Sequence, residues 1–200
     1  DWFCADMDER LREGGIELHF GERAVAYLGE DKVEAIQTDA GEYPVDVVVN
    51  AIGFVPNTAL GEGHLELGAG RAFRVDEHQR TSDPDVYAVG DCATIYSNAL
   101  RAETYIALAT NAVRSGIVAG HNIAGTELAA IGVQGANGIS VFGLNMVSCG
   151  LSVKAAERAG IEVEWTDFED LQRPGFMREN ANVKIRIVYE RDSRRIVGAQ

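Results

Sequence analysis

The most informative stretch of this sequence is Arg80-Thr81-Ser82-Asp83-Pro84-Asp85-Val86-Tyr87-Ala88-Val89-Gly90-Asp91-Cys92-Ala93. Thr81 to Asp85 predict a turn, because proline disfavours helix at the residue before it and short polar side chains bond to nearby backbone. Val86 to Val89 predict a short strand that runs directly into Gly90-Asp91. A strand that ends in this way places one carboxylate at the carboxyl edge of a sheet, where open α/β folds bind ligands.

The significance of Asp91 depends on the residues that come after it in the chain. Ile106 to Ile123 has the strongest helical pattern of the sequence, with its apolar residues on one stripe. The free N–H groups and positive dipole end of such a helix favour an electron-rich ring edge. Gly-Asp alone is a weak signal, since a turn carboxylate is more often a cap or a solvated group. Followed by a short loop and a long helix, it predicts a site where Asp91 accepts hydrogen bonds from sugar or ribityl hydroxyls.

The residues before this stretch have the pattern of the end of an α/β domain. Asp6 to Glu13 predict a helix that Asp6 caps and that Gly14-Gly15 ends. Val45 to Ile52 form a β-branched run that is typical of a buried strand in a parallel sheet. Short strands are predicted over Ile16–Phe20, Ala24–Leu28 and Val33–Thr38.

The pattern changes near Gly125 to that of an α+β unit, and we place a domain boundary around residues 123–131. The predicted elements are a strand over Ile139–Val147, a helix over Ser152–Arg158, a strand over Ile161–Thr166 and a final hairpin. In the first strand of that hairpin, Val183, Ile185, Ile187 and Tyr189 alternate with residues 182, 184, 186 and 188. This alternation predicts that one face packs while the other is largely wet.

Composition narrows the classes of function. The chain has 31 acidic and 18 basic residues and a net charge of −13, which disfavours nucleic acid and anionic membranes as partners. Cys4, Cys92 and Cys149 lie far apart, a pattern that indicates small buried thiols in a reducing cytoplasm. The histidines do not cluster with cysteines, so no metal site is predicted, and no apolar run is long enough to span a bilayer. We expect a soluble cytoplasmic protein.

Three motifs in this order resemble the flavoprotein disulfide reductases: Val47 to Thr58, the Gly-Asp stretch, and Ile106 to Ala112. Two later runs, Gly132 to Ile139 and Val141 to Leu151, are similar to those of the water-forming NADH oxidases of the pyridine nucleotide–disulfide oxidoreductase family. NADH peroxidases and coenzyme A disulfide reductases are the nearest neighbours within it. The resemblance covers essentially all 200 residues.

The resemblance implies six cofactor-binding positions and no catalytic residue in this chain. Asp91 matches the carboxylate that holds the ribityl chain of FAD. Gly53 matches a position on the nicotinamide side of the NAD domain, and Gly138 a glycine near the NAD site. The remaining matches are Ala107, Leu108 and Ala109, whose backbone approaches the flavin ring and the stacked nicotinamide. The alternative for each alanine and glycine is helix packing or a tight turn.

The implied fold is α/β combined with α+β, in three parts. Residues 1–55 would be the C-terminal part of a Rossmann-like NAD-binding domain, residues 56–123 the second segment of an FAD-binding domain, and residues 124–200 a truncated dimerisation domain of a homodimer. The sequence contains no Gly-x-Gly-x-x-Gly turn for a dinucleotide pyrophosphate. The match of Cys92 in relatives is not the family's redox cysteine, which we expect outside this chain.

The implied activity is hydride transfer from NADH to FAD, followed by reduction of dioxygen to water with the help of the redox cysteine. We expect the 200-residue chain to be inactive by itself. One alternative is an NADH peroxidase, which would use peroxide, or a coenzyme A disulfide reductase. Another is a non-catalytic dimerisation module, supported by the intact pattern after residue 131.

Overall fold

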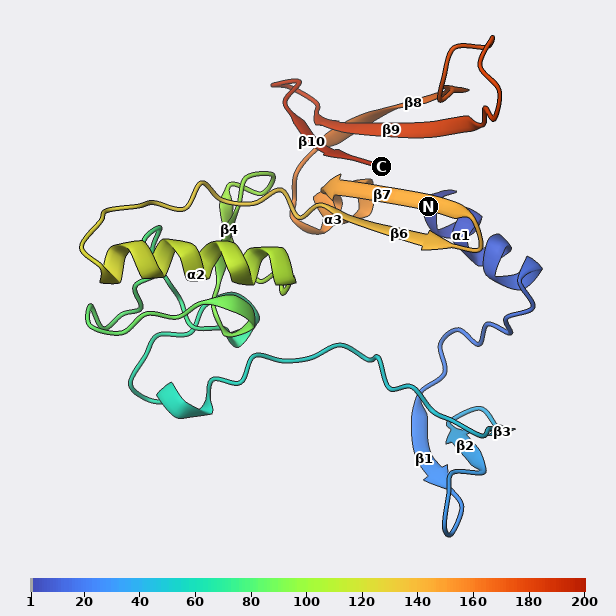
Figure 1. The fold of residues 1–200 in the computed structure, drawn as a ribbon, viewed down its shortest axis with the longest axis horizontal. Coiled ribbons are helices and arrows are strands. Elements are labelled where there is room, and N and C mark those ends of the chain that lie inside the picture. Colours follow the sequence, from blue (N-terminus) through green and yellow to red (C-terminus); the bar gives the residue numbers. More distant parts are fainter. Residues whose placement is uncertain (1) are drawn as a thin grey trace. The chain divides into compact units, whose positions relative to one another are not determined.

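A computed structural model describes residues 2–200, with side chains from Phe3 onward. The chain forms two compact units. The first unit runs through Phe54 and includes Val141–Leu144, and the second comprises Val55–Ser140 and Asn145–Gln200. Figure 1 labels the α-helices and most of the strands of both units. In the part of the chain that the structure describes, no helix has the length and apolar character needed to cross a membrane.

The first unit begins with helix α1, Trp2–Glu13. Its end is the one predicted: Ile16 N donates to Leu11 O at 3.0 Å, and Gly15 has a φ of 83°, a conformation that glycine adopts without strain. The predicted start is wrong, because the helix has already begun at Trp2 and Asp6 lies within it. The position of Asp6 therefore excludes a capping role.

A three-stranded antiparallel meander follows in the order β1-β2-β3. Its strands are β1 (Ala24–Leu28), β2 (Ala35–Thr38) and β3 (Glu42–Pro44). The first two were predicted, whereas no strand forms over Ile16–Phe20. The predicted buried strand over Val45–Ile52 is also wrong: the side chains of Val47 and Val49 are 75% and 84% exposed. A strand needs neighbouring backbone for its hydrogen bonds, and no strand among residues 2–200 pairs with this segment.

The first part of the second unit contains the short turns η1 (Ala59–Gly61), η2 (Ala69–Arg71) and η3 (Gly90–Cys92), a two-stranded hairpin and helix α2. The hairpin strands are β4 (Ile95–Ser97) and β5 (Ala102–Thr104). The turn at Thr81–Asp85 is confirmed, with Val86 N donating to Asp83 O at 3.0 Å. The predicted strand after it is reduced to a single bridge between Arg80 and Tyr87. A small core of Phe73, Ala88 and Ala93 packs beneath these turns.

Helix α2, Ala109–Ile123, begins three residues later than predicted. Leu108 has extended backbone, with φ −136° and ψ 138°, so Ile106 to Leu108 cannot belong to the helix. The side chain of Asn111 donates to Ile106 O at 3.2 Å and satisfies the carbonyl that a longer helix would have used.

The rest of the second unit is a five-stranded sheet in the order β6-β7-β10-β9-β8, with helix α3 (Val153–Arg158). The strands are β6 (Asn137–Val141), β7 (Leu144–Gly150), β8 (Val163–Leu171), β9 (Asn182–Glu190) and β10 (Ile196–Ala199). The predicted helix is confirmed, and Ser152 Oγ caps it by accepting from Ala155 N at 3.2 Å. The predicted single strand over residues 139–147 is instead a hairpin, because Phe142 and Gly143 turn the chain with φ values of 45° and 81°.

The packed face of β9 is not the predicted one. Val188 is completely buried, while Ile185 and Ile187 remain 37% and 38% exposed. On the face of Val188, the guanidinium of Arg186 makes two bonds of 2.6 Å to Asp167 and lies 5.4 Å from the ring of Trp165. A bidentate ion pair and a ring contact let this face bury an arginine, so alternation of apolar residues alone points to the wrong side.

We expect Gly198→Ala to destabilise the second unit. A Cβ at this buried glycine would lie 2.7 Å from the backbone nitrogen of Leu151, and overpacking of this kind lowers the free energy of unfolding by about 1–3 kcal/mol. Gly116→Ala is the matched control, because a Cβ on this exposed face of α2 meets nothing within 4 Å. Removing a helix glycine there should raise stability by up to about 1 kcal/mol. Urea unfolding measures the free energy of unfolding of both variants. Equal changes in this free energy would contradict the described packing.

Candidate flavin-binding turn and helix

The turn that carries Asp91 is held against helix α2. Gly90 N donates to the buried Ser115 Oγ at 3.0 Å. Gly90 has a φ of 72°, and a Cβ on it would lie 3.4 Å from the Cβ of Ala112. A side chain at position 90 would therefore meet both backbone strain and the helix. Glycine at position 90 allows the turn to pack closely against α2. This close packing fixes the backbone of the next residue, Asp91.

Asp91 presents an uncommitted carboxylate. The residue is exposed, and within residues 2–200 no group donates a hydrogen bond to its side chain. Its backbone carbonyl accepts from Tyr105 Oη at 2.9 Å. Partial burial, and after it the charges of Asp91 and Cys92, raise the pKa of Tyr105 above its ordinary value. Tyr105 therefore stays protonated at neutral pH and keeps donating, while the Asp91 carboxylate remains open to a ligand.

The start of α2 lacks a side-chain cap. The carbonyl of Leu108 accepts from Asn111 N at 2.9 Å and from Ala112 N at 3.0 Å, but the N-cap residue Leu108 supplies no side-chain hydrogen bond to the first turn. Such an end offers donors and the positive end of the helix dipole to an electron-rich group. Ala107 and Leu108 are half-buried and Ala109 is exposed, so the backbone at this end is accessible.

Of the six predicted positions, Asp91 alone lines the small cavity beside α2. The other lining residues of this cavity include Gly90, Ile106, Asn111 and Ser115, whereas Ala107, Leu108 and Ala109 are not among them, so their place in a common site with Asp91 stays a prediction. Asn111 and Ser115 were missed by the sequence reasoning. Both are polar residues buried in α2, and polar residues at helical spacing between apolar ones are the signal that could have found them.

The two other predicted positions lie elsewhere. Gly53 belongs to the first unit, is exposed and has a φ of 86°, which favours glycine on backbone grounds alone. Gly138 is an exposed residue of β6, and its closest neighbours are Met146 and Val147 of β7. Their roles as cofactor contacts stay predictions.

A larger cavity of about 800 Å³ lies in the second unit, along α2. Its lining includes Arg114, Ile117 and Val118 of α2 and the segment that ends at Val133. The apolar stripe of α2 faces outward here: Val113 and Ile117 are 63% and 52% exposed. This exposed surface has the apolar character that is usual for the interior of a protein.

Residues 3–116 of the chain match the family described as pyridine nucleotide-disulphide oxidoreductases. The chain belongs to this family.

Three known proteins show how close the relation is. An NADH oxidase of Lactococcus lactis is 60% identical over 99% of this chain, but the match covers only 45% of that protein. The water-forming NADH oxidase of Lactobacillus brevis, solved with bound NADH, shares 33% identity and superposes with a TM-score of 0.92, covering 98% of this chain and 44% of that one. An NAD-dependent persulfide reductase of A. fulgidus shares 30% identity and a TM-score of 0.90, with coverages of 97% and 36%.

The predicted relation to the pyridine nucleotide-disulphide oxidoreductases and the predicted α/β character are therefore confirmed. The chain spans about 45% of the length of the curated relative it matches.

The described residues also show how the histidines, cysteines and carboxylates are distributed. From residue 2 onward, no three His, Cys, Asp or Glu side chains are grouped to hold a metal ion. Within residues 2–200, Cys4, Cys92 and Cys149 form no disulfide, and Cys92 Sγ donates to Val89 O at 3.3 Å. The prediction that all three thiols are buried is wrong, because Cys4 is exposed and the other two are half-buried. Cys92 thus faces its own backbone turn, and Asp91 carries the open functional group of this stretch.

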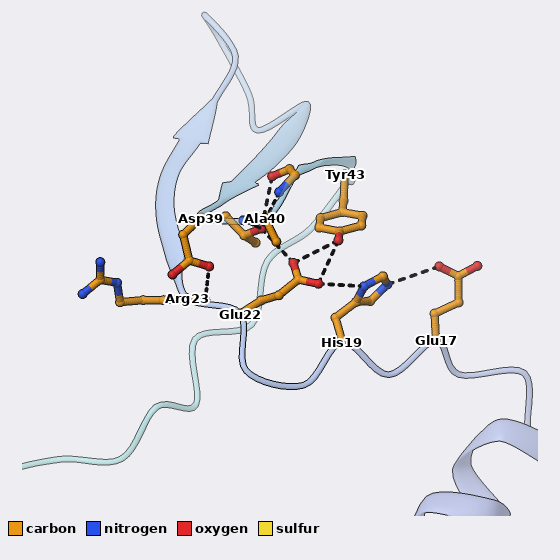
Figure 2. A network of polar contacts seen from close by, with 9 residues as sticks. Glu17, His19, Glu22, Arg23, Asp39, Ala40 and Tyr43 are labelled. Carbon is orange, nitrogen blue, oxygen red and sulfur yellow. Dashed lines mark hydrogen bonds and ion pairs between the residues drawn. The ribbon is translucent and has the colours of Figure 1, made fainter.

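A polar network in the first unit has a structural role (Figure 2). Glu22 accepts from Thr38 Oγ1 at 2.8 Å, from Tyr43 Oη at 2.9 Å and from His19 Nδ1 at 3.2 Å. The other ring nitrogen of His19 lies 3.6 Å from Glu17. Hydrogen bonds from Thr38 and Tyr43 lower the pKa of Glu22, and the bond to Glu22 raises the pKa of Tyr43. The network joins the segment before β1 to β2 and β3.

We expect this network to make the first unit sensitive to acid. Because the folded-state pKa of Glu22 lies below its ordinary 4.5, its contribution is present above that value and is lost as the pH falls through the lower folded-state pKa. Glu22→Gln should therefore destabilise the meander at about pH 7, with a smaller difference at about pH 3.5, in urea titrations followed by amide signals of β1 to β3. Glu17→Gln is the control, since Glu17 is 90% exposed at its side chain. A pH-independent effect of Glu22→Gln would contradict this account.

Proposed function

We propose that this chain is the C-terminal part of an FAD-dependent NADH oxidase that reduces dioxygen to water. The observation that carries the proposal is the exposed, uncommitted Asp91 carboxylate held beside the uncapped start of α2. The proposal is also supported by a relative, an NADH oxidase that is 60% identical over 99% of this chain.

The residues present fit a flavin. A carboxylate suits the ribityl hydroxyls, because it can accept several hydrogen bonds at once. The accessible backbone at Ala107, Leu108 and Ala109 suits the polar edge of the ring, which the helix dipole would stabilise. When bound, FAD would supply hydride acceptance from NADH and electron transfer to dioxygen. The role of this chain is to orient the cofactor, with Gly53 and Gly138 on the side of the nicotinamide.

The proposed organisation has the three predicted parts. Residues 1–55 would close an NAD-binding domain, residues 56–123 would complete an FAD-binding domain, and residues 124–200 would contribute to dimerisation. The exposed apolar face of β9, with Val183, Ile185 and Ile187, supports the last assignment, because such a face favours association. We infer a cytoplasmic homodimer, in keeping with the net charge of −13 and the sparse, widely spaced cysteines of the sequence.

A second candidate is a reductase of disulfides or persulfides from the same family. It is favoured by the A. fulgidus persulfide reductase, whose fold matches nearly as closely as that of the water-forming oxidase. Both candidates would use the Asp91 site in the same way, and they differ in the electron acceptor. An assay that offers dioxygen and a persulfide separately distinguishes them.

A chimera tests the proposal directly. This chain replaces the matching 45% of the Lactococcus lactis NADH oxidase, and flavin content and oxygen-dependent NADH oxidation are measured. We expect both to be retained. Asp91→Ala should weaken FAD binding by about tenfold or more, because hydrogen bonds to a charged group are lost.

The control for this chimera is Asp85→Ala, which removes an exposed carboxylate from the turn before Tyr87. It should leave flavin content unchanged. A folded chimera that holds flavin but consumes NADH only with a sulfur acceptor would favour the second candidate. A folded chimera that holds no flavin would overturn the proposal.

The isolated chain should show no oxygen-dependent NADH consumption, even with added FAD. Its proposed positions are contacts to cofactors, and none of them is a redox centre. Oxygen uptake and NADH absorbance measure this, with the active chimera as the positive control. Turnover by the isolated chain would show that the site is complete without the additional length of the relatives.

A further inference from the structure

The β4–β5 hairpin connects the Asp91 turn with the five-stranded sheet. At the base of the hairpin, Asp91 lies a few residues before β4 and Tyr105 comes directly after β5, and their hydrogen bond of 2.9 Å closes this end. The two strands pair in an unbroken register from Ile95↔Thr104 to Ser97↔Ala102. Because the hairpin is so short, its tip and base cannot move independently.

Arg195 holds the tip of this hairpin. Its guanidinium donates to Asn98 O at 3.2 Å and to Ala99 O at 3.1 Å, and it bonds to Glu190 Oε1 at 2.6 Å. Ala99 is only 4% exposed, so these carbonyls are not freely available to water. The planar fork of arginine suits such an arrangement, because it can reach two carbonyls and one carboxylate from a fixed position.

A second contact fixes the same tip from the side. Asn98 N donates to Val133 O and Val133 N donates to Tyr96 O, each at 2.9 Å. The segment around Val133 then leads to the sheet, where Gly150 N donates to Gln134 O at 2.7 Å. The hairpin is therefore anchored to the sheet along β4 as well as at its tip.

The charges around Arg195 strengthen this anchor. Hydrogen bonds from Arg195 and Ser193, together with the charges of Arg195 and Arg101, lower the pKa of Glu190. Arg101 lies at the hairpin tip, with a φ of 53°. Glu190 thus remains ionised between two arginines, one from the sheet and one from the tip.

We propose that Arg195 is a positioning residue, which sets the Tyr105–Asp91 contact from the sheet through the β4–β5 hairpin. The functional consequence rests on the proposed function, because it matters for catalysis only if Asp91 holds the cofactor. The mechanical coupling itself stands on the hydrogen bonds of the second unit. Through this coupling, the proposed dimerisation region influences the position of residues at the proposed flavin site.

Amide hydrogen exchange of the 200-residue chain tests the coupling. Arg195→Met keeps an unbranched, flexible side chain, although a shorter one, and removes its hydrogen-bond donors. We expect exchange to accelerate by about tenfold or more at Asn98 and Val133, and to a smaller extent at Gly90 and Ala93 near Asp91. Arg194→Met is the matched control, because Arg194 is 64% exposed and pairs with Glu164 on β8.

Arg195→Lys separates positioning from general destabilisation. It retains one charged donor and should recover part of the protection at the hairpin tip and near Asp91. Faster exchange confined to residues 190–200, or spread evenly over the second unit, would overturn the proposal. So would equal effects of Arg194→Met and Arg195→Met.

Flavin affinity in the chimera tests the consequence for the site. Arg195→Met should weaken FAD binding by about three- to tenfold, and Tyr105→Phe should weaken it by a similar factor. The loss of FAD affinity in the double variant should be smaller than the product of the two single losses. Additive effects would contradict action through Tyr105. If the unmodified chimera binds no flavin, the proposed function fails, whereas the exchange experiment still decides whether Arg195 positions the hairpin.

Discussion

The close approach of the Gly90 turn to helix α2 is the constraint that shapes the described site. The backbone N–H of Gly90 donates to Ser115, and the φ of 72° at Gly90 strains any other residue there, whose Cβ would lie against Ala112. This contact fixes the next residue, Asp91, whose carbonyl accepts from Tyr105 and which is itself exposed. One hydrogen bond and one absent Cβ therefore place a charge beside the end of a helix, which is the arrangement a polar cofactor requires.

Around this site the molecule shows two kinds of surface. Buried polar groups such as Asn111 and Ser115 satisfy backbone where the chain turns into α2, so the interior of this region is polar and specific. The outer stripe of α2 and the segment of Val47 and Val49 are apolar and exposed. Exposed apolar surface of the second kind is unfavourable in water, and it favours association with other apolar surface.

Sequence patterns predicted local elements well where the cause is local. The stop of α1 at Gly14-Gly15 and the presence of helix α3 depend on nearby residues, and both were predicted, although the capping role of Ser152 was not. The predicted strand over Val45–Ile52 failed, because a strand exists only with a neighbour to bond to. The face of β9 was misassigned for a related reason: Arg186 can be buried once Asp167 on the next strand neutralises it.

The family, the turn before Asp91 and the long helix after it could be determined from the sequence alone, because they depend on residue order and short-range backbone chemistry. The tertiary structure was needed to establish where α2 begins, that Tyr105 and Ser115 hold the Asp91 turn, and that Arg195 reaches the hairpin tip. Arg195 and Ala99 are far apart in the sequence, and no local pattern encodes their contact. Such contacts arise when packed elements bring a donor and a buried carbonyl together, and the cost of leaving that carbonyl unpaired then maintains them.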